Sequence, residues 1–440
     1  MSPHPVIVVR GPNGKPSAEA MASLDRRWRA SYLLLAPHRL GFCLAMAVLV
    51  AAGGWWALVQ LDRMSGALAL SYALSPSLVH GAVMTFGFIP LFFSGFLFTA
   101  GPKWLGVPPL RTAQLLAPLL LQAAGWLLWL AAAHLRAGLA MTALLLAGIG
   151  LAWMTLLFWR LIRRSRATDR VHALTIGTAC LVGCLSLAGL ALGVALDAPG
   201  VALACVLTGL WGFVLVVYVT VAHRMIPFFT ASAIPRMDAW RPFWLLWLML
   251  AVATFEVLAA WVESIGPVEG VGGAVWPLLR GSLELAAGGL LLWLALSWGL
   301  VKSLKNRLLA MLHIGFVWFG LALLLGGVAQ LVGWVQGAAV LSLGALHALT
   351  LGCLASLMLA MVTRVSCGHS GRALVADGMA WSLFWLLQAA TLLRIAAAAQ
   401  TNWAGGLLLA AALLWAGVMA VWGLRLGNWY GRLRADGRPG

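Results

Sequence analysis

The chain has 440 residues, of which 62% are hydrophobic and only 9% are charged. A soluble globular domain is nearer half apolar and about a quarter charged, so this composition excludes an ordinary soluble protein. The formal charge of +17 does not indicate nucleic-acid binding, because the cytoplasmic loops of membrane proteins collect Lys and Arg.

Continuous apolar runs, broken by charged residues, Pro or Gly, predict about twelve transmembrane helices of roughly 20 residues each. In chain order the spans lie near residues 41–61, 78–100, 112–133, 138–161, 172–195, 200–222, 242–262, 276–300, 308–333, 340–362, 379–399 and 404–424. We therefore expect an all-α fold, a polytopic membrane helix bundle at 39–426. A cytoplasmic tail at 1–38, expected to be mobile, precedes the bundle, and a second cytoplasmic tail at 427–440 follows it.

The distribution of Lys and Arg predicts how the bundle is oriented. If the N-terminus is inside, the inner loops and tails carry nearly all of the 29 basic residues. The exceptions are Arg63 and Arg136 in outer loops, and Arg280 and Arg394 near the outer ends of spans. Because cytoplasmic loops are the positive ones, both termini are expected in the cytoplasm. The expected location is the inner membrane of a bacterium, with the spans in contact with the lipid bilayer.

The nine histidines differ in predicted depth. His4, His38 and His134 fall in the tail or in loops, where we expect them to be solvated. His80 and His347 lie inside spans, near the outer end of the second and about two turns into the tenth. Small residues flank both and let a flat ring approach the backbone. Two imidazoles at similar depth on different helices can ligate one haem iron from opposite faces. The alternative is that each imidazole bonds a neighbouring helix.

A second group of histidines lies toward the predicted cytoplasmic side. His223 ends the sixth span, His313 lies in the first turns of the ninth, and His369 follows the tenth, close to Cys367. Several imidazoles with a nearby thiol suit copper or another borderline-soft metal. The other interpretation is that these are separate interface and loop residues, as His172 at the start of the fifth span also suggests.

Four charged residues lie within the spans away from their cytoplasmic ends. Arg280 and Arg394 are expected near the propionates of a haem held by His80 and His347, because the planar guanidinium suits carboxylates. The alternative is that both side chains extend to the outer membrane interface, or that Arg280 forms an ion pair with Glu284 one helical turn away. Glu256 and Glu284 are the deepest acidic residues, and each is either a proton relay or a buried neutral acid.

Six stretches between residues 80 and 372 form an ordered set of motifs. They are HGAVMTFGF at 80–88, GFLFTAGPKWLG at 95–106, HRMIPFFT at 223–230, HIGFVW at 313–318, HALTLG at 347–352 and TRVSCGHSGR at 363–372. This set resembles the NnrS family, whose forms are roughly HxHEMxFGF, GFLxTAxPxWxG, GRxIPxFT, HLGYxW, HALTVG and MTRxSLGHTGR. The resemblance covers most of the chain.

The NnrS resemblance implies a haem- and copper-containing polytopic membrane protein associated with nitric oxide metabolism. The second His and the Glu of HxHEM correspond here to Ala82 and Val83, and His223 stands where many members have Gly. Haem is therefore implied more strongly than copper. The chain contains no CxxCH motif, so a b-type haem, held without covalent bonds, is expected.

The leading hypothesis is a haem-binding inner-membrane protein of the NnrS type in the response to nitric oxide or nitrosative stress. It would act by redox or ligand chemistry at haem and at a second metal, with nitric oxide or another diatomic molecule as ligand and an unidentified electron donor. One rival is a secondary transporter, in which intramembrane charges form an ion or substrate path. Another is a partner that assembles, or delivers metal to, a respiratory complex.

Overall fold

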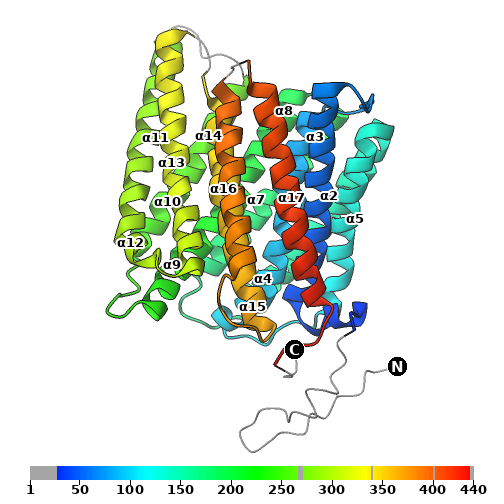
Figure 1. The fold of residues 1–440 in the computed structure, drawn as a ribbon, viewed down its shortest axis with the longest axis vertical. Helices are drawn as coiled ribbons and strands as arrows, with labels where there is room; N and C mark the ends of the chain where they lie inside the picture. The colour runs from blue at the N-terminus through cyan, green and yellow to red at the C-terminus, as the bar shows by residue number, and fades with distance from the viewer. Residues whose placement is uncertain (1–26, 266–270, 338–339, 400–401, 437–440) are drawn as a thin grey trace, which may run out of the picture.

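A computed structural model describes residues 27–265, 271–337, 340–399 and 402–436 of the protein (Figure 1). Within these ranges every regular element is helical, and twelve helices are long and apolar enough to cross a membrane. The predicted all-α bundle of about twelve spans is therefore confirmed. Most of the tail predicted at 1–38 lies outside the described residues.

Nine spans are single helices. They are α2 (Pro37–Ser65), α5 (Ala113–Leu135), α6 (Ala137–Arg164), α7 (Val171–Ala195), α10 (Phe243–Ile265), α11 (Val271–Ser297), α13 (Arg307–Gln336), α16 (Gly378–Ala396) and α17 (Ala404–Tyr430). The other three spans each contain a π-helical segment between two α-helices. They are α3–η2–α4 (Pro76–Ala82, Val83–Gly87, Ile89–Leu105), α8–η3–α9 (Pro199–Thr208, Gly209–Leu215, Val216–Ala233) and α14–η4–α15 (Ser342–His347, Ala348–Ala355, Ser356–His369). Short helices η1 (Ala30–Leu35), α12 (Leu300–Ser303) and η5 (Ala397–Ala399) complete the described elements.

Local sequence signals set the ends of several helices, as in α13. The side chain of Asn306 accepts hydrogen bonds from the backbone N–H groups of Leu308 at 3.1 Å and Leu309 at 3.4 Å. This is the usual N-cap, which satisfies donors that have no partner within the helix. The helix ends at Gly337, whose φ of +67° is the left-handed conformation that glycine adopts most easily.

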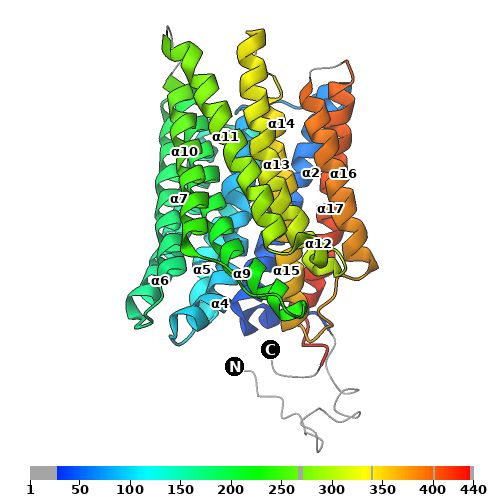
Figure 2. The same ribbon diagram turned by 90° about the vertical axis from the view of Figure 1, so that its left-hand side faces the viewer.

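The spans are arranged in three consecutive groups of four. The second span of each group is the one that carries a π-helical segment. The fourth span of each group packs against the first span of the next, through α6–α7, α11–α13 and α17–α2 (Figure 2). Each group contains an even number of spans, so the first span of every group begins at the same side of the membrane.

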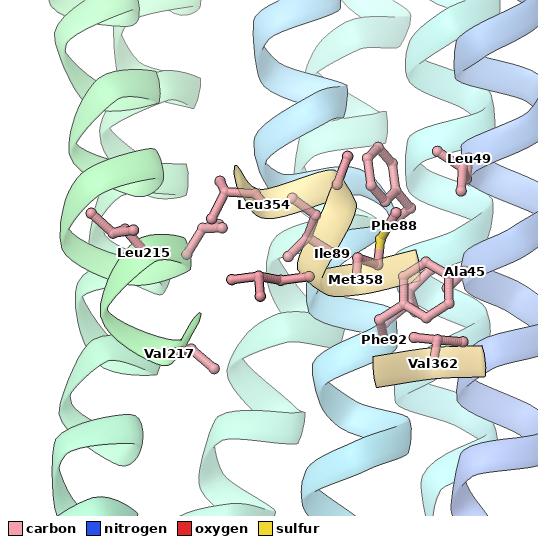
Figure 3. Close-up of a cluster of buried hydrophobic side chains, with 14 of the residues drawn as sticks. Ala45, Leu49, Phe88, Ile89, Phe92, Leu215, Val217, Leu354, Met358 and Val362 are labelled. Atoms are coloured by element: carbon pink, nitrogen blue, oxygen red, sulfur yellow. The ribbon is translucent and has the colours of Figure 1, made fainter. Parts of the chain in front are cut away.

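The second spans of the three groups lie toward the interior and meet in the apolar core. Phe88, Ile89 and Phe92 from the first group face Leu215 and Val217 from the second, and Leu354, Met358 and Val362 from the third (Figure 3).

Both ends of the described chain lie at one face of the bundle (Figure 1). The backbone N–H of Arg29 donates to the carbonyl of Gly431 at 2.8 Å. An even number of spans requires this arrangement. The assignment of that face to the cytoplasm still rests on the positive charges in the loops on that side.

Candidate functional site

His347 is the last residue of α14 and immediately precedes η4. Its Nδ1 lies 2.7 Å from the carbonyl oxygen of Leu343. A carbonyl only accepts hydrogen bonds, so Nδ1 carries the hydrogen and Nε2 keeps its lone pair. Metal-ligating histidines are usually held in this way, with the second ring nitrogen bonded to a carbonyl or carboxylate.

His80 lies in the last turn of α3, before η2, and is held differently. Its ring stacks on Trp56 of α2, with centroids 3.9 Å apart and ring planes inclined by 20°. The Nδ1 atom is buried and has no hydrogen-bond partner within the described part of the chain. A buried polar atom without a partner is rare in native proteins and points to a missing water or ligand.

His80 and His347 line the same cavity, in the half of the bundle opposite the termini. The cavity has a volume of about 340 Å³, which falls within the usual range for small-molecule and cofactor sites. Its walls are mainly apolar. Among them are Met84, Phe88, Leu207, Leu210, Leu346, Leu354 and Met358. The space near the two imidazoles is thus not filled by side chains.

Arg394 of α16 lines this cavity together with the two histidines. Within the described ranges no carboxylate forms an ion pair with its guanidinium. An unpaired cation inside a membrane span is costly and usually has a functional partner. The cavity therefore presents two imidazole nitrogens that can ligate a metal and one cation. This combination suits an anionic cofactor that contains a metal ion.

The π-helical segments contribute to the site. η2 and η4 follow directly after the helical turns that hold His80 and His347, and η3 supplies Leu210 to the cavity wall. A π-helical segment disrupts the regular i→i+4 hydrogen bonding and is frequent at functional sites. Here all three border the same cavity.

Arg280 does not lie with His80 and His347. It lines a second, larger cavity of about 570 Å³, where its guanidinium bonds Glu256 at 2.9 Å, Glu284 at 2.8 Å and also Glu263. The structure shows the other expected interaction of Arg280, an ion pair with Glu284, extended by two further carboxylates. The two cavities adjoin and share wall residues Leu207, Leu343 and Leu346.

The proposed second metal set of His223, His313 and His369 is not brought together. His223 Nδ1 lies 3.0 Å from Nε2 of His172, whereas His313 Nε2 lies 2.9 Å from the hydroxyl of Thr230. In the residues that the structure describes, no three His, Cys, Asp or Glu side chains form a metal-ligand group. Each of these histidines has a different neighbour: His172 for His223, Thr230 for His313 and His38 for His369.

Two histidines expected in solvent are packed instead. His38 is 4% exposed and contacts His369, with ring centroids 4.5 Å apart and ring planes inclined by 43°. His134 bonds Trp55 at 2.7 Å and the carbonyl of Ser71 at 2.9 Å. His4 lies outside the described residues. His38 lies in the first turn of α2 and His134 in the last turn of α5, so both belong to spanning helices and not to loops.

The fold and cavities define a polytopic helical membrane protein with a cofactor-sized internal site flanked by two imidazoles. The NnrS protein family model matches residues 32–434, nearly the whole chain, and the chain belongs to the NnrS family. A comparison with curated proteins gave no match.

Proposed function

We propose that this NnrS-family protein is an inner-membrane haem protein that acts in the response to nitric oxide or nitrosative stress. The observation that carries the proposal is the cavity between His80 and His347, since both rings reach it from separate helices and Arg394 joins them. The chain has no CxxCH motif, which favours a b-type haem bound without covalent links.

The side chains around the cavity suit this group. Nε2 of His347 is free to ligate because Nδ1–H is committed to the carbonyl of Leu343. His80 would ligate from the other face, held by its stacking on Trp56. Arg394 would pair with a propionate, since guanidinium and carboxylate form strong charge-assisted bonds.

A bound haem would supply one-electron chemistry, with a potential set by its axial ligands and surroundings. If His80 and His347 both ligated the iron, they would compete with nitric oxide for it. That arrangement would favour electron transfer. Binding of nitric oxide would need either the release of one imidazole from the iron or a different site in the protein. The predicted copper ligands do not gather, so we propose no copper site.

The test is the absorption spectrum and haem content of the full chain purified in detergent from cells supplied with haem. We expect a Soret band and sharp reduced α bands in the wild type. Haem should be lost, or its coordination changed, in His80→Ala and in His347→Ala. His134→Ala is the matched control, because this imidazole lies at the same end of the bundle but outside the cavity. Full haem content with an unchanged spectrum in both cavity variants would refute the ligand assignment.

The same spectrum separates the haem protein from a secondary transporter. A colourless preparation from haem-supplied cells would favour the transporter, for which the cluster of Arg280, Glu256 and Glu284 is the supporting observation. Many transporters are built from two halves related by inverted repeats. The π-helical segments here recur in thirds, and this pattern supports the haem protein as the first candidate.

A further inference from the structure

The second cavity contains an unusual arrangement of charge around Arg280 of α11. One guanidinium bonds three carboxylates, from Glu256 and Glu263 of α10 and from Glu284 of its own helix. The haem proposal does not use this cluster.

The bonding atoms show that two of these carboxyl groups are neighbours. Nε of Arg280 donates to Glu284 Oε1 at 2.8 Å, and Nη2 donates to Glu256 Oε2 at 2.9 Å. The N–H bonds of Nε and Nη2 run parallel along one edge of the guanidinium, which normally holds the two oxygens of a single carboxylate. Here two separate carboxyl groups occupy that edge, so they lie side by side.

Both neighbours are deeply buried and incompletely bonded. Glu256 is 2% and Glu284 is 4% exposed. The other oxygen of each, Oε1 of Glu256 and Oε2 of Glu284, has no hydrogen-bond donor in the parts of the chain described, although both residues line the cavity. Two adjacent carboxylates in a poorly solvated site do not both ionise readily, because like charges at short distance raise the free energy of the doubly charged state.

The charges nearby do not compensate a second negative charge. Arg280 supplies one positive charge, and Glu263, which is 43% exposed, also bonds it. The facing helix α13 contributes only uncharged residues to the cavity, including Gly326 and Gln330. Gly326 leaves room for Glu284, since a Cβ at this position would lie 2.6 Å from Oε2.

We propose that Glu256 and Glu284 form a carboxyl pair that shares one proton and exchanges it with water at the end of the bundle opposite the termini. The shared proton lies between the two carboxyl groups and leaves one negative charge beside Arg280. The cavity, at about 570 Å³, is large enough for several waters. It extends to the partly exposed Glu263, which provides the route for exchange.

Infrared spectroscopy of the full-length protein at neutral pH tests this proposal through the C=O stretch of protonated carboxyl groups. In the wild type we expect a band with the intensity of one buried carboxyl group per chain, which shifts in D2O. Both Glu256→Gln and Glu284→Gln should abolish it, because either change leaves one carboxylate to pair with Arg280. Glu263→Gln is the matched control: it removes a carboxylate from the same guanidinium and should retain the band.

Three results would overturn the proposal. A band that survives in one of the two single variants would identify one ordinary neutral acid instead of a shared proton. The absence of a band in the wild type would show that both groups are ionised, and this measurement needs no variant. A band that does not shift in D2O would exclude exchange with water. Gel filtration and thermal unfolding of each variant establish that it is folded, and haem content has no bearing on any of these outcomes.

Discussion

Trp56 is the residue that most directly tests how the candidate haem site is held. Its indole stacks on His80 at 3.9 Å, and among the described residues the buried Nδ1 of that histidine has no hydrogen-bond partner that would orient the ring. Stacking is therefore the main contact that fixes the ring plane. An aromatic pair contributes about 0.5–1.5 kcal/mol beyond the burial of its area.

A tenfold change in a binding constant corresponds to about 1.4 kcal/mol. If this stacking energy holds His80 ready to ligate, Trp56→Leu should raise the dissociation constant for haem by roughly two- to twelvefold. Trp56→Phe keeps a ring and should have a smaller effect. The assay is titration of haem-free, detergent-purified protein with haemin, followed by the Soret band.

The control for this experiment is Trp55→Leu. Trp55 is the preceding residue on α2 and bonds His134 at 2.7 Å, but it does not line the cavity. An unchanged haem affinity in Trp56→Leu would refute the reasoning, as would an equal loss in Trp55→Leu. Either result would mean that the ring of His80 is oriented by something other than the indole.

Three further predictions concern other parts of the bundle. Arg394→Gln should weaken haem binding roughly tenfold or more in the same titration, because hydrogen bonds to charged groups contribute about 1.5–3 kcal/mol. Gln388→Leu should lower the free energy of unfolding by about 0.6–1.7 kcal/mol per bond lost, since Gln388 bonds side chains of both α13 and α15. A hydrogen bond from Arg425 holds the pKa of Asp377, outside the spans, at about 2. The contribution of this hydrogen bond to the free energy of unfolding should therefore be complete above the pKa of about 4 that Asp has in the unfolded chain. It should be lost as pH falls toward 2.

Each of these predictions has a matched comparison. Arg136→Gln removes an arginine at the same end of the bundle and should leave haem affinity unchanged. Gln122 is 1% exposed, and its amide has no hydrogen-bond partner within the described ranges. Gln122→Leu should therefore change the free energy of unfolding very little. Asp377→Asn keeps a side-chain acceptor at the start of α16 but cannot titrate. Equal pH dependence of unfolding in this variant and the wild type would contradict the role given to Asp377.

The candidate site illustrates where sequence reasoning succeeds in a membrane protein. Depth in a span follows from counting residues, because each residue adds about 1.5 Å along a helix. His80, His347 and Arg394 were expected at similar depth, and the structure places all three around one cavity. Arg280 also lies near that depth but belongs to the adjoining cavity. Depth alone could not separate these two cases.

Trp56 and the carboxyl pair show what sequence reasoning missed. The many tryptophans near predicted interfaces are ordinary in a membrane protein, so nothing marked Trp56 as the stacking partner of His80. Glu256 and Glu284 were recognised as deep acids, but their approach to one edge of Arg280 depends on α10 and α11 presenting them to each other. The π-helical segments gave no signal in hydropathy either.

The amino-acid sequence by itself determined the number of spans, their order and which residues lie inside the membrane. It did so because each span must satisfy its own backbone hydrogen bonds and match the bilayer thickness, and these are local requirements. Only the tertiary structure decided which spans are neighbours and which side of each helix faces a cavity. Those choices depend on side-chain packing between residues far apart in the chain, which hydropathy along one helix does not encode.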